Sequence, residues 1–148
     1  MEQNRLHQSR IQRKWIAARI EGHAKREALF WMITFKGNDR AIGSICFWNF
    51  DPTFHSAEIG YELHHDFWSK GVMSEALSAV INYGFNEMDL HRIEGLPIAK
   101  NEPSKRLLLK LGFKLEGTFR ERIFFRGKYE DQLILGLIRT EWKNRKVS

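Results

Sequence analysis

A short stretch around Gly71 contains the residues best suited to bind an anion. Trp68, Ser69, Lys70 and Gly71 run without a break into an apolar pattern of helical spacing that includes Ser74. Free N–H groups and the helix dipole favour an anion at a helix N-terminus, and a glycine lets phosphate oxygens approach the backbone. The run matches neither the Walker pattern nor the three-glycine dinucleotide pattern, so an ordinary turn before a helix is the alternative.

Other reactive side chains have simpler interpretations. Cys46 is the only cysteine, which excludes an internal disulfide and a cysteine-cluster metal site, and its apolar surroundings predict a buried, inert thiol. His64 and His65 adjoin the loop, but the sequence offers no third ligand at a usable spacing, so no metal site is expected. Glu58 and Glu62 alternate along an expected strand and therefore share one of its faces.

Periodicity and turn residues predict a mixed α and β fold in a single domain over residues 1–148. The first expected elements are an amphipathic helix over 8–27 and three antiparallel strands within 28–63. A helix of about four turns from Val72 and a strand over 91–100 follow. The last are a helix over 102–112 closed by Gly112 and a two-strand hairpin over 113–142. Turns at 36–40, 51–55 and 126–128 connect the strands. No repeat, linker or low-complexity segment interrupts this order.

Composition limits the classes of function. The 148 residues are 43% hydrophobic and carry a formal charge of +6, from 24 Lys and Arg against 18 Asp and Glu. The basic residues are spread along the chain rather than clustered, so nucleic acid is not the expected partner. The sequence shows no signal peptide and no apolar run of about eighteen residues, which predicts a cytoplasmic protein without a membrane span.

The element order and three further motifs resemble the GNAT superfamily of acyl-CoA N-acyltransferases. The motifs are LHRIE at 90–94, Asn101 followed three residues later by Ser104, and KLGFKLEG at 110–117, which are most similar to the ribosomal-protein N-terminal acetyltransferases. Gly71 matches the central glycine of the family's pyrophosphate loop, whereas Trp68 and Met73 depart from its first and last positions. The resemblance implies a mostly antiparallel sheet of about six strands flanked by helices.

The same resemblance implies acetyl-CoA as co-substrate and assigns roles to individual residues. Glu58 corresponds to the general base, with Glu62 as the rival carboxylate, and Ser104 corresponds to the residue that protonates the sulfur. A surface carboxylate, a helix cap at Asn101 and a solvated Lys110 are the alternatives. Leu108 occupies the position where some relatives have a tyrosine acid. Coenzyme A binding is expected at Tyr61, Glu62, Leu63, Trp68, Ser69, Lys70, Gly71, Val72, Met73, Ser74, Asn101, Ser104 and Lys110.

By comparison with this family, the chain lacks a first strand and helix. The strand at 28–35 would then be an unpaired apolar edge, which we expect to be covered by a dimer contact or by the helix over 8–27. The expected activity is N-acetylation of a primary amine, with a protein N-terminus as one candidate acceptor. A coenzyme A-binding module without catalysis and a polyamine or small-amine acetyltransferase are the alternatives, although net positive charge disfavours a polycation.

Overall fold

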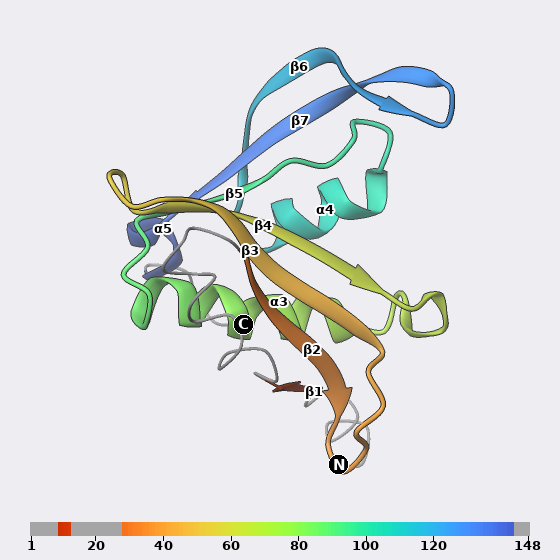
Figure 1. Cartoon of the computed structure of the whole chain (residues 1–148), viewed down its shortest axis with the longest axis vertical. Coiled ribbons are helices and arrows are strands. Elements are labelled where there is room, and N and C mark those ends of the chain that lie inside the picture. Colours follow the sequence, from red (N-terminus) through yellow and green to blue (C-terminus); the bar gives the residue numbers. More distant parts are fainter. Residues whose placement is uncertain (1–8, 13–27, 144–148) are drawn as a thin grey trace.

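The strands expected within 28–63, 91–100 and 113–142 all form. The computed structural model describes residues 9–12 and 28–143, and for residues 9–12 it describes the backbone (Figure 1). The strands are β1 Ser9–Gln12, β2 Leu29–Phe35, β3 Gly43–Asp51, β4 Ser56–Leu63, β5 Arg92–Gly95, β6 Lys114–Phe125 and β7 Lys128–Ile138. They form one seven-stranded sheet in the order β1-β2-β3-β4-β5-β7-β6, which confirms the mixed α and β fold class.

Two helices lie where the apolar periodicity places them, α3 Val72–Asn86 and α4 Glu102–Lys110. The 3-10 helix η1 His65–Phe67 was not predicted, and α5 Arg139–Lys143 corrects the end of the hairpin expected over 113–142, because the strand stops at Ile138. Asn101 caps α4 by accepting a hydrogen bond from the N–H of Ser104, and Gly112 follows its end with a φ of 100°, as expected for a glycine at that position. Among the described helices, none combines the length and apolarity that a membrane crossing needs.

The N-terminal segment differs from the prediction. Residues 9–12, which the periodicity assigns to a helix, form β1 and pair antiparallel with β2 from Ser9 opposite Phe35 to Gln12 opposite Met32. The rest of the expected helix, 13–27, lies outside the described residues. Local helical periodicity is a weak preference, whereas the edge of β2 offers a row of unpaired N–H and C=O groups. A strand of the same chain therefore covers the part of this edge at residues 32–35, in place of the expected helix, and the dimer contact stays a prediction.

One pair of strands determines where the molecule opens. Every neighbouring pair in the sheet is antiparallel except β4 and β5, which run parallel. Their pairing covers only three positions and ends where Glu58 lies opposite Glu94. Beyond this point β4 continues to Leu63, whereas β5 ends at Gly95. The two strands therefore separate and leave a gap on one side of β4.

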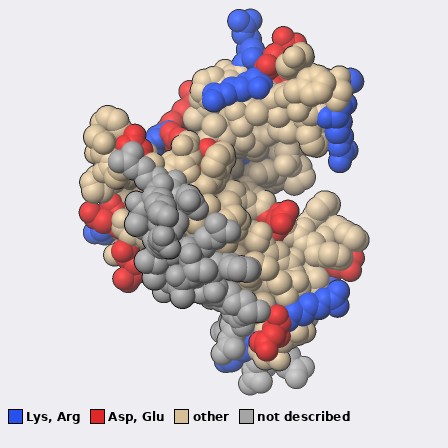
Figure 2. All heavy atoms as spheres, viewed as in Figure 1, with Lys and Arg blue, Asp and Glu red and all other residues tan. Residues whose placement is uncertain are grey.

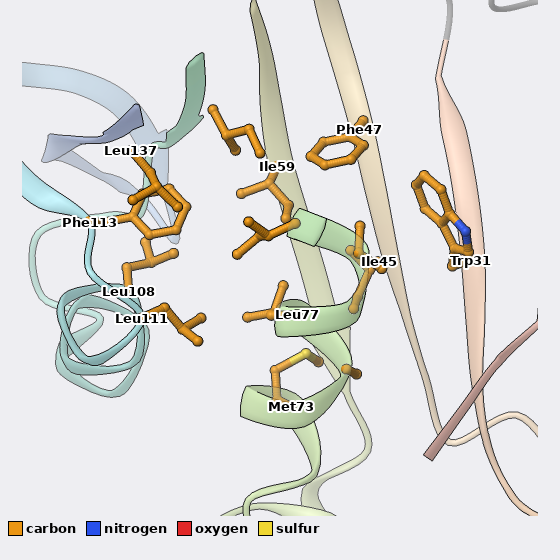
Figure 3. Close-up of a cluster of buried hydrophobic side chains, with 14 of the residues drawn as sticks. Trp31, Ile45, Phe47, Ile59, Met73, Leu77, Leu108, Leu111, Phe113 and Leu137 are labelled. Atoms are coloured by element: carbon orange, nitrogen blue, oxygen red, sulfur yellow. The ribbon is translucent and has the colours of Figure 1, made fainter. Parts of the chain in front are cut away.

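A continuous apolar core joins α3 and α4 to the sheet (Figure 3). Trp31, Phe47, Leu77 and Leu111 are fully buried within it, and the rings of Trp31 and Phe47 meet edge to face at 5.6 Å. Complete burial of an apolar side chain contributes about 1.5–3 kcal/mol, so this core holds α3 firmly beneath the strands.

An arginine connects β5 to β6 across the strand between them. Arg92 donates to the two carboxylate oxygens of Glu116 at 3.0 and 2.5 Å and to Glu94 at 2.9 Å. Gly136 of β7 lies under this contact, and a Cβ atom there would come within 2.6 Å of the guanidinium. The hydrogen bonds raise the pKa of Arg92 and lower the pKa of Glu116. The network fixes the carboxylate of Glu94 beside the point where β4 and β5 separate.

Gly84, in the last turn of α3, tests how tightly this core is packed. A Cβ atom there would lie 2.8 Å from Cζ of Phe47 and 3.1 Å from Cδ1 of Leu90, both of which are buried. Alanine favours a helix by about 1 kcal/mol, but overpacking a fixed core costs about 1–3 kcal/mol. We therefore expect Gly84→Ala to lower the free energy of unfolding by about 1 kcal/mol in chemical denaturation.

The matched control is Gly117→Ala in β6, where the nearest atom to an added Cβ is Cδ1 of Ile134 at 3.7 Å. This substitution should change stability by less than about 0.5 kcal/mol. Equal stability of the Gly84→Ala variant and the unsubstituted protein would contradict the tight packing described for α3.

Candidate functional site

The separation of β4 from β5 opens into a cleft of about 940 Å³. In the space-filling view a hollow lies between the β6–β7 side of the molecule and the part that carries the end of β4 and η1 (Figure 2). The residues that line the cleft are Trp48, Glu58, Ile59, Gly60, Tyr61, Glu62, Leu63, Phe67, Trp68, Ser69, Gly71, Val72, Met73, Ser74, Gly95, Leu96, Pro97, Asn101, Pro103, Ser104, Arg106, Leu107, Leu108 and Lys110.

One end of the cleft is built to accept an anion. Gly71 is the N-cap of α3 in a left-handed conformation, with φ of 75°, and no side chain caps the helix. The N–H groups of the first helical turn, at Val72, Met73 and Ser74, have no intrahelical acceptor. Because this is also the positive end of the helix dipole, an external anion would supply both the missing acceptors and the favoured charge.

The loop that presents this helix end is tethered to β4. The indole N–H of Trp68 donates to the carbonyl of Leu63 at 2.7 Å. Ser69 and Gly71 both have positive φ, of 60° and 75°, so the chain turns sharply between η1 and α3. Val72 and Met73 then point their side chains into the core. The backbone, rather than these side chains, faces the cleft at the helix start.

The wall formed by α4 carries hydroxyl groups and cations. Ser104 lies in the first turn of α4, and its Oγ is 2.5 Å from the hydroxyl oxygen of Tyr61 on β4. Burial raises the pKa of Tyr61, and the contact with Ser104 partly offsets this. Arg106 and Lys110 lie one turn apart further along the same helix and also line the cleft. This wall can therefore attract an anion and donate protons.

The other end of the cleft is acidic. Glu58 is half-buried where β4 and β5 separate, and burial is the main cause that raises the pKa of its carboxyl. Glu94 adds to the rise, whereas a hydrogen bond from Asn49 and the charge of Arg122 oppose it. Glu62 lines the same cleft but is exposed. A carboxylate with a raised pKa is a better proton acceptor than an ordinary one, so Glu58 is the stronger candidate base.

Cys46 lies beside this acidic end and is half-buried rather than fully buried as expected. Burial raises the pKa of its thiol, and the charges of Glu58 and Glu62 raise it further. The thiolate, which is the nucleophilic form, is therefore disfavoured near neutral pH. This environment agrees with the inert thiol predicted from the sequence.

The cleft gathers the predicted site residues with one exception. All of them line it except Lys70, which is exposed outside the lining. Sequence reasoning missed the opposite rim, where Gly95 ends β5 and is followed by Leu96 and Pro97, and it missed Trp48 and Arg106. The glycine at the end of the short strand and the proline after it were the available signal for the rim. Nothing in the local pattern marks Trp48, because its position depends on pairing with β4.

His64 and His65 have a neighbour that the sequence analysis did not count as a ligand. Asp66 brings a carboxylate oxygen to 3.5 Å from Nδ1 of His64 and to 3.1 Å from Nε2 of His65. The ligand atoms of the three residues lie within 4.8 Å of one another, and all three side chains are exposed. The statement that no third ligand exists at a usable spacing is therefore wrong, since the turn of η1 folds Asp66 back towards both imidazoles.

Comparisons with known proteins agree with this geometry. Residues 4–114 match the model of the acetyltransferase (GNAT) domain. The uncharacterized N-acetyltransferase p20 of Bacillus licheniformis is 37% identical over 123 residues, which cover 83% of this chain and 67% of that protein. The ribosomal-protein-serine acetyltransferase of Escherichia coli is 33% identical over 119 residues, which cover 80% of this chain and 65% of that protein.

A solved structure has the same fold. The ribosomal-protein-S5-alanine acetyltransferase from Vibrio fischeri superposes with a TM-score of 0.76 at 29% sequence identity, over 85% of this chain and 69% of that chain. The chain thus spans about two thirds of the length of the relatives it matches.

The tether from Trp68 to Leu63 predicts how the anion-binding loop responds to substitution. Trp68→Phe removes the hydrogen-bond donor and keeps an aromatic ring. Since the indole is exposed, we expect a loss of global stability below about 1 kcal/mol. Local opening of the loop should increase, so the hydrogen-bonded backbone amides of residues 67, 68 and 75, which flank it, should exchange with deuterium about fivefold faster.

Trp48→Phe is the matched control, because Trp48 is also exposed and lies on β3 opposite Glu58. It should leave exchange of the amides of residues 67, 68 and 75 unchanged. Unchanged exchange in the Trp68→Phe variant as well would show that the tether does not order the loop.

Proposed function

The chain belongs to the GNAT family of acetyltransferases, and on that basis we propose that it transfers an acetyl group from acetyl-CoA to a primary amine. The observation that carries the proposal is the uncapped start of α3, which faces the gap between β4 and β5. Coenzyme A has a diphosphate and an extended pantetheine arm, and this cleft offers an anion site joined to a groove along a free strand edge.

The proposed seat of coenzyme A uses the loop and both walls of the cleft. The N–H groups at the start of α3 hold the diphosphate, with Ser69 and Ser74 as further donors. Arg106 and Lys110 add positive charge from α4. The backbone of Tyr61, Glu62 and Leu63 pairs with the pantetheine arm, in place of the strand that ends at Gly95. Asn101 contributes its side-chain amide from the start of α4.

The proposed chemistry uses the two chemically different ends of the same groove. Glu58 accepts a proton from the acceptor ammonium, directly or through water, and so frees the nitrogen lone pair to attack the thioester carbon. The nitrogen–carbon bond forms as the carbon–sulfur bond breaks, and Ser104 donates a hydrogen bond and then a proton to the departing sulfur. The acylated nitrogen loses its second proton to water, and water replaces the proton that the serine side of the cleft gave up. Glu58 suits this role better than the exposed Glu62, because its raised pKa increases its affinity for the proton.

We propose a protein N-terminus as the acceptor and the cytoplasm as the location. Two of the relatives carry names that describe acetylation of ribosomal proteins, which supports this class of acceptor. The acidic end of the cleft suits a cationic amine, and the open hollow admits a polypeptide end. A polyamine would meet the same carboxylates but would be repelled at long range by the net positive charge. A coenzyme A-binding module without turnover is the remaining alternative.

Gly71→Glu tests the anion site. The substitution places a carboxylate at the N-terminus of α3, where it competes with and repels the diphosphate. We expect affinity for coenzyme A, measured by calorimetry, to fall by at least about a hundredfold, which corresponds to roughly 2.7 kcal/mol.

Gly71→Ala is the control, because a Cβ atom at this position would meet no other atom within 4 Å and adds no charge. It imposes the same positive φ on a side chain, at a cost of about 1–2 kcal/mol to the fold. Its effect on coenzyme A affinity should be only a few-fold. Equal affinity of the glutamate variant and the unsubstituted protein for coenzyme A would show that the diphosphate does not bind at this helix end.

Glu58→Gln tests the base. The variant keeps the shape of the side chain but accepts no proton, so turnover should fall by about 10²–10⁴-fold with coenzyme A affinity unchanged. Thiol release with a panel of amines and peptides is the measurement. In the unsubstituted protein, activity should decline as the pH falls through the raised pKa of Glu58, because a base must be deprotonated; this acid limb should be absent from the variant.

Glu62→Gln is the matched control from the same strand, and it should retain most of the turnover. Loss of turnover in the Glu62 variant with normal turnover in the Glu58 variant would show that Glu62, and not Glu58, is the base. Coenzyme A binding without thiol release from any acceptor would favour the module without catalysis.

A further inference from the structure

We propose that Tyr61 is a positioning residue that aims the hydroxyl of Ser104 at the sulfur of coenzyme A. The proposal rests on the proposed function of the cleft. It adds a second residue that acts on the leaving sulfur. Helix α4 itself supplies no phenol, because Leu108 occupies the position where some relatives have a tyrosine. The two hydroxyl groups come from separate elements, β4 and the first turn of α4, and meet in the cleft wall.

The contact is short and both partners are fixed. The phenol oxygen of Tyr61 lies 2.5 Å from Oγ of Ser104, and the pair is partly buried. The main chain of Ser104 is held by the cap at Asn101, whose Oδ1 accepts from the N–H of Ser104 at 3.3 Å. Leu108 is buried one turn further along α4. A serine hydroxyl rotates freely unless a partner fixes it, and Tyr61 is that partner here.

Either hydroxyl can donate in this contact, and the proposal takes the phenol of Tyr61 as the donor. Each hydroxyl has one proton to donate and can accept in return. If Tyr61 donates to Ser104, the serine proton is left to point into the cleft. In the opposite direction Ser104 would give its proton to Tyr61 and have none for the sulfur. Burial raises the pKa of Tyr61, so the phenol remains protonated and able to donate near neutral pH.

The protons balance in the resulting step. As the carbon–sulfur bond breaks, its electron pair passes to sulfur, and the serine O–H donates a hydrogen bond to the developing thiolate. Proton transfer from Ser104 to sulfur completes the thiol, and the phenol proton moves towards Oγ of Ser104. The acylated nitrogen loses its second proton to water as the amide is completed, and water returns a proton to Tyr61. Glu58 passes the proton taken from the ammonium to solvent, so one proton is released in each turnover. No oxidant, metal or further reactant is needed.

The size of the effect follows from hydrogen bonding to a charged acceptor. Such a hydrogen bond favours the anion by roughly one to two powers of ten in an equilibrium constant. Removal of the phenol hydroxyl leaves Ser104 in place but lets its proton turn elsewhere. We therefore expect Tyr61→Phe to cost about tenfold in thiolate stabilisation, and Ser104→Ala to cost at least as much.

The first experiment titrates the thiol of bound coenzyme A and needs no acceptor. The ultraviolet absorbance of the thiolate is followed against pH for the unsubstituted protein and for Tyr61→Phe, Ser104→Ala and the double variant. We expect the acid dissociation constant of the bound thiol to fall about tenfold in Tyr61→Phe. The double variant should have the same acid dissociation constant as Ser104→Ala, because Tyr61 acts through Ser104. Tyr129→Phe is the matched control, because Tyr129 is exposed on β7 outside the cleft lining.

The second experiment measures steady-state kinetics on the same variants. Tyr61→Phe should lower kcat about tenfold with KM for acetyl-CoA unchanged, and it should have no further effect when Ser104 is already alanine. Equal titration of the bound thiol in Tyr61→Phe and the unsubstituted protein would overturn the inference while leaving the proposed function intact. An effect of Tyr61→Phe that persists in the Ser104→Ala background would also overturn it, since Tyr61 would then act directly. Failure of the unsubstituted protein to bind coenzyme A would overturn both.

Discussion

The cleft depends on the early end of one parallel strand pair. β4 and β5 share only three paired positions, and the last of these is Glu58 opposite Glu94. A longer β5 would satisfy the backbone of β4 as far as Leu63 and would fill the gap with a strand. Because β5 stops at Gly95, the free edge of β4 lies between α3 and α4, and a ligand with amide groups can pair with it.

This interruption also separates two opposite charge environments along one groove. The start of α3 and the cations of α4 attract an anion at one end, whereas Glu58 and Glu94 meet at the other. The Arg92 network limits the repulsion between these carboxylates, and partial burial still raises the pKa of Glu58. Separation matters because a base surrounded by cations would lose its affinity for a proton. The sheet thus keeps the proposed diphosphate site and the proposed base apart.

The limits of sequence reasoning lie where contacts join distant segments. The helix over 8–27 was predicted from one modest apolar face, yet residues 9–12 pair with β2, because an open strand edge outweighs weak local preference. The contact between Tyr61 and Ser104 spans 43 positions, and no local pattern marks it. The approach of Asp66 to His64 and His65 depends on the turn of η1, which residue spacing alone did not reveal.

The sequence by itself determined the strands β2 to β7, the helices α3 and α4, the glycine at the start of α3 and most of the residues of one wall of the cleft. Periodicity, turn residues and caps act over a few positions, so they can be read along the chain. The tertiary structure alone decided which side chains meet, how β4 and β5 separate, and why the pKa of Glu58 is raised. Those properties arise from burial and from partners distant in sequence, which local spacing does not encode.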